Sequence, residues 1–472
     1  MPNSSQNCTC PPEFLLWESI FSRYTPPTRC STLGENVLAD FNLHASSHAR
    51  HKIAARLLPF LFVLYIVNYL DRTSVAYAAI GMSRELGFSD RVFGLGAGIF
   101  FLSYIALQIP GALLVERWSA RRVIFLTMVS WGTLTALTAF VHTPGQLYLA
   151  RFVLGAAEAG FFPGVIVYLS HWFIKEDRAK ATGNFMAAIP LSFVIGSPIA
   201  GWILPHNWFG LAGWRWLFVL EGFPAIVLGI AALFYLPDWP VDAHWLTADE
   251  RIWVREKLAE EKPVTKTRSM GEALRSRVVL LLAVVAFLDY LAGYTVIFWL
   301  PTILKRQTGY SDLHVGWVGA IPYAVALVAM FVNGWHSDRT CERRWHAAVP
   351  LFASVLGFVI LLVAPGSASM TVFAFTLVCL FNAFLSPFWA IPTEILSESA
   401  AAAAVGMINA IASVAGFAGP YLFGYLNTQT GSFSVGFVVL MTSALAASLL
   451  ILVMPGAKQS IPVEGFALET PS

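Results

Sequence analysis

Charged side chains are scarce in this sequence. Asp, Glu, Lys and Arg make up 12% of its 472 residues, about half of the roughly 25% found in soluble domains. Because so few charges cannot cover the surface of a soluble chain of this length, the composition excludes an ordinary soluble protein. The 30 basic residues are balanced by 28 acidic ones. The excess of positive charge that nucleic-acid binding requires is therefore also missing, and we expect no nucleic-acid partner.

Several chemical signatures are missing as well. The five cysteines are too scattered to indicate a disulfide-stabilised fold or a zinc site. No glycine-rich phosphate-binding loop occurs, which excludes transport driven by ATP. The apolar segments contain neither a nucleophile paired with a base nor a cluster of metal ligands. The sequence therefore predicts a protein that is not an enzyme and that binds no cofactor and no metal.

Long apolar runs are what the sequence has in abundance. Hydrophobic residues make up 57% of the chain, and its mean hydropathy is +0.65. A helical run of about 17 to 25 apolar residues crosses the roughly 30 Å hydrocarbon core of a bilayer. We therefore predict an all-α membrane protein with twelve transmembrane helices, at residues 57–80, 92–115, 123–141, 147–170, 181–204, 215–236, 278–302, 313–335, 347–364, 370–391, 400–424 and 433–454.

The basic residues indicate how these helices are oriented. With twelve spans both termini lie on one side, and that side receives 23 Lys and Arg against 4 on the other. The positive-inside rule therefore predicts that both termini are cytoplasmic. We expect a multi-pass protein of the cell (inner) membrane, acting as a monomer in the lipid bilayer. The predicted parts are a disordered cytoplasmic N-terminal extension (1–50), a six-helix half (51–236), a central cytoplasmic loop (237–277), a second six-helix half (278–456) and a cytoplasmic tail (457–472).

An internal repeat supports two equivalent halves. The loop after the second span contains an acid followed by three arginines, and the loop after the eighth repeats this pattern 222 residues later: Glu116, Arg117, Arg121, Arg122 and Asp338, Arg339, Arg343, Arg344. Pro198 and Pro420, in the fifth and eleventh spans, are also 222 residues apart. Two pseudo-symmetric six-helix halves are typical of alternating-access carriers. The two loops are either gates that latch and release a neighbouring helix end or simple basic anchors on the cytoplasmic side.

Four charged residues fall within predicted spans and are the main candidates for function. Asp71 and Arg72 are adjacent in the first span, whereas Arg151 and Glu158 are seven residues apart in the fourth and so share one face of a helix. A charge inside the membrane costs at least about 2.5 kcal/mol, so it indicates function by default. The arginines suit a carboxylate ligand, and the acids suit uptake and release of a proton. In the alternative interpretation, the four charges only neutralise one another and hold two helices together.

Other polar residues in the spans are weaker candidates. Tyr290 with Tyr294, and Asn409 with Ser413, are each spaced to share a helix face, where they can contact substrate or form interhelical hydrogen bonds. Asp289, in the seventh span, is either a second carboxylate of the substrate cavity or the partner of a nearby polar group. Glu221 is interpreted as structural, near Arg215 and neighbouring tryptophans.

Five segments together resemble one known family. They are NYLDRTSVAYA from Asn68, RFVLGAAEAGFFPG from Arg151, WRWLFVLEGFPA from Trp214, LPDWPVDAHWLTADER from Leu236 and GWHSDRTCERRWH from Gly334. The sequence from about residue 50 to 455 resembles the anion:cation symporter family of the major facilitator superfamily. This resemblance implies the major facilitator fold, a proton-coupled symporter of organic anions, anion binding at Arg72 and Arg151, proton coupling at Asp71 and Glu158, and polar substrate contacts from the seventh and eleventh spans.

From the residues and the resemblance together, we expect a secondary active transporter that imports an organic anion, such as a sugar acid or a tartrate-like carboxylate, with protons. Organophosphate antiporters of the same superfamily carry an Arg in the seventh span, where this chain has Tyr294, which argues against a phosphate substrate. Two alternatives remain open: an anion exchanger or facilitator without proton coupling, and a membrane sensor that binds its substrate without transporting it.

Overall fold

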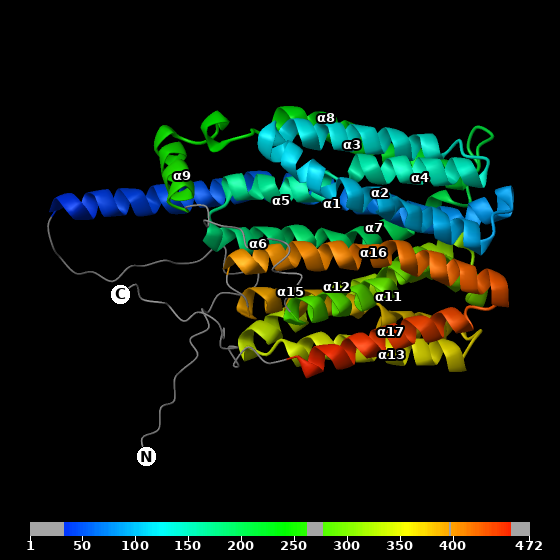
Figure 1. The fold of residues 1–472 in the computed structure, drawn as a ribbon. Helices are drawn as coiled ribbons and strands as arrows, with labels where there is room; N and C mark the ends of the chain where they lie inside the picture. Colours follow the sequence, from blue (N-terminus) through cyan, green and yellow to red (C-terminus); the bar gives the residue numbers. More distant parts are fainter. Residues whose placement is uncertain (1–32, 262–276, 396–397, 455–472) are drawn as a thin grey trace, which may run out of the picture.

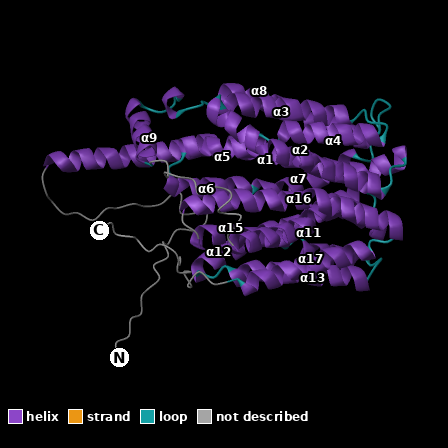
Figure 2. Cartoon of the chain, viewed as in Figure 1, coloured by secondary structure: helices purple, strands orange, loops and turns teal. Residues whose placement is uncertain are grey.

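Helices form almost all of the described chain. The computed structural model describes residues 33–261, 277–395 and 398–454, and within them the only β-type pairing is an isolated bridge between Trp208 and Leu211. Figure 2 shows the long helices joined by short loops. The first half of the chain contains α1 (Leu33–Leu86), α2 (Asp90–Arg117), α3 (Ala120–Thr138), α4 (Pro144–Glu158), α5 (Phe161–Trp172), α6 (Lys175–Met186), α7 (Ala188–Ile203) and α8 (Gly213–Tyr235).

The rest of the described chain is built in the same way. A short connecting region holds the 3-10 helix η2 (Pro240–Asp242) and α9 (Ala248–Glu260). The second half contains α11 (Arg277–Thr308), α12 (Asp312–Thr340), α13 (Arg344–Val363), α14 (Ala368–Val378), α15 (Phe381–Ile395), α16 (Glu398–Thr430) and α17 (Ser434–Val453).

All twelve predicted spans coincide with helices. Three of them are each formed by two consecutive helices: α4 with α5, α6 with α7, and α14 with α15. Eleven segments of the described chain are long and apolar enough to cross a membrane. The remaining predicted span corresponds to α3, which has only 19 residues and begins with Arg121 and Arg122 in its first turn. Its composition is therefore less apolar than that of the others.

The predicted N-terminal boundary needs a correction. The helix α1 begins at Leu33, so residues 33–50, which were expected to belong to a disordered extension, are helical. The polar stretch before the membrane does not stop the helix, because there is no proline between Leu33 and Pro59. Residues 1–32, the end of the central loop (262–276) and the C-terminal tail lie outside the described residues, and the other domain boundaries remain predictions.

The two halves lie side by side along the bundle. Figure 1 shows the blue-to-green helices of the first half above the green-to-red helices of the second, with α7 and α16 at the junction. The halves meet through α2 with α16, α7 with α12, and α1 with α11. The first two pairs are equivalent under the 222-residue repeat, since α2 corresponds to α12 and α7 to α16. The fold therefore has the pseudo-symmetric arrangement that the repeat predicted.

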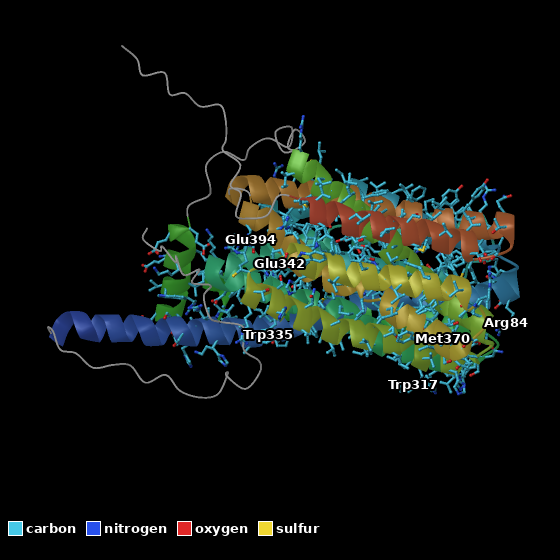
Figure 3. The ribbon with its side chains drawn as sticks, turned by 90° about the horizontal axis from the view of Figure 1, so that it is seen from below. Arg84, Trp317, Trp335, Glu342, Met370 and Glu394 are labelled. Carbon is cyan, nitrogen blue, oxygen red and sulfur yellow. The ribbon has the colours of Figure 1, made fainter. Side chains whose placement is uncertain are left out.

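The bundle has two distinct ends. We call the end with residues 117–122 and 339–344 the basic end, and the end with residues 84–91, 305–312 and 427–434 the far end. Figure 3 shows Glu342 and Glu394 toward the basic end and Arg84 at the far end. At the far end, Ser89 and Ser311 cap α2 and α12 by accepting hydrogen bonds from the backbone, which fixes where these helices begin.

Glycines bring the two halves into backbone contact toward the far end. A Cβ atom on Gly201 of α7 would lie 2.6 Å from the Cα of Gly316 on α12, and one on Gly98 of α2 would lie 2.7 Å from the carbonyl oxygen of Phe417 on α16. Only glycine allows such close approach of two helices. The halves are therefore closed against each other at this end.

Gly201→Ala is expected to loosen this closure. The added methyl group meets backbone atoms that cannot move independently, which costs about 1–3 kcal/mol. We expect a single cysteine at Val315→Cys, a buried position next to Gly316, to react several-fold faster with a thiol reagent than it does without the Gly201 change. Gly145→Ala, where the added Cβ meets nothing within 4 Å, is the matched control. Equal labelling rates in the two variants would contradict a tight glycine contact.

Ion pairs reinforce the far end. Arg306 of α11 donates to both carboxylate oxygens of Asp90 at 2.6 and 2.5 Å, and Asn427 of α16 also donates to this carboxylate. The backbone N–H of Arg91 donates to the Thr428 hydroxyl at 2.9 Å. These contacts join the start of α2 to two helices of the other half. Polar contacts as well as glycines thus hold the halves together here.

At the basic end, α9 is bound to the part of α1 that projects from the bundle (Figure 1). Glu250 of α9, only 3% exposed, accepts hydrogen bonds from Lys52 at 2.9 Å and contacts His48 at 2.9 Å. Its other oxygen accepts the backbone N–H of Thr247, completing a capping box. Burial alone would raise the pKa of the Glu250 carboxyl, but these donors outweigh burial and lower the pKa to about 2.

This depressed pKa predicts how the docking of α9 depends on pH. The ionised carboxylate stabilises the docked helix fully above the ordinary pKa of 4.5, and this contribution is lost as the pH falls from about 4.5 toward 2. Glu250→Gln should remove on the order of 2 kcal/mol at pH 7, so that amide hydrogen exchange in α9 becomes roughly 30-fold faster. Glu256→Gln, on an exposed position of α9, should leave exchange unchanged. Similar rates in both variants would refute the role of Glu250.

Candidate functional site

A buried polar segment in the middle of α1 forms the centre of the site. Asn68, Asp71, Arg72, Thr73 and Ser74 are each no more than 3% exposed, although this helix is otherwise largely apolar. Neighbouring residues of an α-helix point about 100° apart. Asp71 and Arg72 therefore point in different directions, and each is positioned to meet its own partner.

The four predicted charges form two crossed ion pairs between α1 and α4. Arg72 Nη2 donates to Glu158 Oε1 at 2.8 Å, and Arg151 Nη1 donates to Asp71 Oδ2 at 3.3 Å. All four side chains are at most 3% exposed. Each helix supplies one acid and one base, so every charge is compensated across the helix contact rather than within its own helix. The structure brings all four together, as their burial in predicted spans required.

Aromatic rings surround the two arginines. The Arg72 guanidinium lies 4.2 Å from the centre of the Tyr69 ring, 5.7 Å from Phe100 and 5.9 Å from Tyr104. The guanidinium of Arg151 lies 4.8 Å from the same Phe100 ring. Such cation–π contacts stabilise a cation where water is excluded. They allow the arginines to remain charged in an apolar environment.

Part of the hydrogen-bonding capacity of this cluster is unused. Among the described residues, Nε and Nη2 of Arg151, Nε of Arg72 and Oε2 of Glu158 have no hydrogen-bond partner. A buried donor without a partner costs free energy unless a ligand supplies an acceptor. The cluster therefore has free, permanently charged donors that suit an anion, and a carboxylate oxygen that suits a proton.

The tyrosines of α11 adjoin the cluster from the other half. The Tyr294 ring lies 4.6 Å from Phe101 of α2 and 5.6 Å from Tyr290, and Tyr294 interacts electrostatically with Arg72. On α16, the Ser413 hydroxyl donates to the backbone carbonyl of Asn409 at 2.7 Å. The structure therefore places Tyr294 beside the charged cluster. It does not bring Asn409 and Ser413 into a hydrogen bond with it among the described residues.

Two further buried acids lie outside the ion pairs. Asp289 of α11 is 1% exposed, and its Oδ1 has no partner among the described residues. Glu221 of α8 has no partner at either oxygen and interacts electrostatically with Asp71. The sequence indicated a structural role for Glu221, near Arg215; in the structure Arg215 binds Glu85 at 2.9 Å. Among the described residues, Glu221 thus has no ion-pair partner.

The acid and the arginines of the first predicted gating loop contact different neighbours. Glu116 is exposed and lies 3.8 Å from the ring nitrogen of His171. Arg121 binds Asp238, with Nε at 3.1 Å from Oδ2, and Ser119 donates to the same carboxylate at 2.8 Å. Arg117 and Arg122 are exposed, and Arg122 lies over the Trp118 ring. Arg121 thus binds Asp238, which follows α8, whereas Glu116 lies near the end of α5; the gating role of the loop stays a prediction.

The second loop uses its own acid. Arg343 Nη1 donates to Asp338 at 2.5 Å, and its Nε donates to Glu394 of α15 at 2.7 Å. Arg344 donates to the backbone carbonyl of Met454 at the end of α17, at 2.8 Å. The side chain of Arg339 lies over the Trp335 ring. This loop therefore contacts two neighbouring helix ends, and the equivalent arginines Arg121 and Arg343 both bind an acid outside their loop.

Sequence reasoning missed two residues that complete these contacts. The hydroxyl of Thr135 on α3 donates to Asp71 Oδ1 at 2.7 Å, and Asp238 holds the first loop. Thr135 carries no signal in the sequence, since threonine is common in membrane helices. Asp238 did carry a signal in the sequence, because it is an acid directly after the sixth span, on the same predicted side of the membrane as the arginines.

The chain is similar to known transport proteins over most of its length. The sequence matches the model of a family described as the Major Facilitator Superfamily over residues 61–311 and 282–469. A protein of Agrobacterium vitis named "Putative tartrate transporter" is 42% identical over 414 residues, covering 85% of this chain and 90% of that protein. The "Inner membrane transport protein RhmT" of Escherichia coli is 36% identical, covering 85% of this chain and 94% of that protein.

Solved structures share the fold at low sequence identity. A bacterial homologue of the human lysosomal transporter Spinster, 19% identical, superimposes with a TM-score of 0.67 and covers 86% of this chain and 95% of its own. A D-xylose-proton symporter, 14% identical, also gives a TM-score of 0.67 and covers 85% of this chain and 98% of its own. At these identities the likeness supports the arrangement of helices alone.

Proposed function

The chain belongs to the Major Facilitator Superfamily and is a multi-pass secondary transporter of a small organic substrate, not an enzyme, and from this premise we propose that it imports an organic carboxylate together with protons. The observation that carries the proposal is the pair of crossed ion pairs, which combines anion-binding donors and proton-binding acids in one buried cluster. The proposed orientation places the basic end and both termini in the cytoplasm.

The cluster suggests how substrate and proton are coupled. While the Glu158 carboxylate is ionised, its Oε1 accepts a hydrogen bond from Arg72 Nη2 at 2.8 Å, and this guanidinium group is not available to the substrate. Protonation of Glu158 weakens this ion pair and releases the forked guanidinium for the substrate carboxylate. The substrate thus replaces one negative charge by another, and the buried site is not left with an uncompensated arginine. Proton and anion therefore bind together, which is the requirement of a symporter.

The surroundings of Arg72 favour a hydroxylated carboxylate. Tyr69, Tyr104 and Tyr294 place phenol groups around the guanidinium, and a phenol can donate to or accept from substrate hydroxyl groups. The relatives named as tartrate transporters support the same substrate class. Among the described residues of α11, no Lys or Arg lies beside Tyr294, which speaks against a dianionic phosphate. We therefore name tartrate and sugar acids as the substrate class.

Uptake into proteoliposomes tests this function. With an inward proton gradient, radiolabelled L-tartrate or a sugar acid should accumulate above its external concentration, and a protonophore should abolish the accumulation. If concentrative uptake survives the protonophore, the symport mechanism is wrong. If every tested carboxylate only exchanges, equally well without a gradient, the chain is an anion exchanger or facilitator. Binding without any movement into vesicles would identify a membrane sensor.

A further inference from the structure

The hydroxyl of Thr135 donates its hydrogen bond to Asp71, one of the two acids of the cluster. It donates to Asp71 Oδ1 at 2.7 Å, while Arg151 donates to Oδ2 at 3.3 Å. Thr135 lies on α3, behind α1 and α4, and is 1% exposed. Both oxygens of Asp71 are therefore bound on the side of the first half, and Asp71 contacts α3 and α4 rather than the junction with the second half.

The other threonines of α3 form a different kind of hydrogen bond from that of Thr135. Thr127, Thr133 and Thr138 each donate to a backbone carbonyl three or four residues earlier in their own helix, at 2.7 to 3.0 Å. This is the usual arrangement for a threonine inside a helix. Thr135 alone among the four donates to another helix. The rotamer of this side chain is therefore set by Asp71 and not by the local backbone.

A hydroxyl can serve both protonation states of a carboxyl group. Toward an ionised Asp71 it donates its hydrogen, as observed. When Asp71 Oδ1 takes up a proton, that O–H can donate to Thr135 Oγ1, whose own hydrogen then turns to the carbonyl of Trp131, four residues earlier on α3. Arg151 has only donors and cannot accept a proton from Asp71. Arg151 can donate to Oδ2 in either form, but of the two groups bonded to Asp71 only Thr135 can bond to Oδ1 both before and after that oxygen takes up the proton.

The other charges around Asp71 do not replace this function. Arg72 is adjacent on α1, Arg151 and Glu158 lie on α4, and Glu221 of α8 interacts electrostatically with Asp71. They set the electrostatic potential at the carboxyl group, and they do so whether or not Thr135 carries a hydroxyl. The contribution of Thr135 is local and directional, so it can be separated from theirs by removing one oxygen atom.

We propose that Thr135 is a positioning residue for proton coupling, whose hydroxyl holds Asp71 in both its ionised and its protonated form and so sets the pH range of net transport. This inference rests on the proposed function, because it assigns a residue to the coupling of proton and anion. It adds a group on α3 that itself touches neither substrate nor solvent.

The test compares Thr135→Val with Thr138→Val. The two changes are identical in chemistry and lie on the same helix at the same 1% exposure, but Thr138 donates only to its own backbone. Uptake of L-tartrate into proteoliposomes is measured across external pH, together with tartrate exchange at equal pH on both sides. We expect Thr135→Val to move the pH of half-maximal uptake upward by about one unit or more, since an ionised Asp71 loses a charge-assisted hydrogen bond.

The remaining variants make the result decisive. Thr135→Ser should restore the wild-type pH profile, exchange should persist in Thr135→Val, and Thr138→Val should keep the wild-type profile. If Thr135→Val does not fold, Thr135→Ala and Thr135→Ser are compared in its place. An unchanged profile on loss of the hydroxyl, or the same shift in Thr138→Val, overturns the proposal. Absence of proton-driven uptake of any tested carboxylate in the wild type overturns the proposed function instead.

Discussion

Arg72→Ala should weaken binding of L-tartrate to the purified carrier by roughly 30-fold or more. The change removes the guanidinium that Glu158 and three aromatic rings hold in place. Loss of one partner of a buried charge-assisted contact costs about 2–5 kcal/mol, and 2 kcal/mol corresponds to a factor of about 30 in Kd. Binding is measured by the ligand-induced rise in thermal unfolding temperature or by calorimetry in detergent.

A second variant separates lost binding from lost folding. Arg72→Ala leaves the carboxylate of Glu158 buried without its partner, which itself destabilises the bundle. The double variant Arg72→Ala, Glu158→Gln removes both charges and should recover much of the unfolding temperature. It should remain unable to bind tartrate. If the double variant binds tartrate as the wild type does, Arg72 is a structural residue and the proposed anion site is wrong.

Asp71→Asn should nearly abolish net uptake while exchange continues. Asparagine has the shape of a protonated aspartic acid and cannot release a proton, so the carrier can return only with substrate bound. We expect proton-driven accumulation of tartrate to fall at least about 100-fold, as is common when an essential proton-transfer group is removed. Exchange of internal for external tartrate should stay within a few-fold of the wild type. Both activities are measured in the same proteoliposomes.

The role of Asp71 is decided by comparing net uptake with exchange. Exchange in the same preparation reports folded, inserted protein, so it serves as the internal control. If net uptake and exchange fall together, Asp71 only balances Arg151, and the protein behaves as an exchanger or facilitator. If neither net uptake nor exchange falls, proton coupling depends on another acid. Glu158, which binds Arg72, is then the next candidate.

Much of the fold could be predicted because the membrane imposes a simple rule. Each apolar run long enough to cross the bilayer must satisfy its backbone in a helix, and all twelve predicted spans are helical. The same rule located Asp71, Arg72, Arg151 and Glu158, since charges in such runs must be buried together. The helix beginning at Leu33 was missed because it extends beyond the membrane, where the apolar pattern gives no signal.

The pairing within the site could not be predicted for physical reasons. Adjacent residues Asp71 and Arg72 diverge by about 100°, so their partners depend on the rotation of α1 against α4, which the sequence does not specify. The threonine of α3 that binds Asp71 looks like the three that bind their own backbone. The acid that binds Arg121 comes from a segment 117 residues away, so only the folded arrangement identifies Asp238.

The distribution of these residues has a consequence for how such a carrier diversifies. The acids, the arginines and Thr135 all belong to the first half of the chain, on α1, α3 and α4. The second half contributes tyrosines of α11 to the border of the site. Under the proposed function, mutations on α11 would alter the border of the site while the residues proposed for anion binding and proton coupling stay unchanged. A chimaera that joins this first half to the second half of a relative is therefore expected to keep its proton coupling and to change its substrate preference.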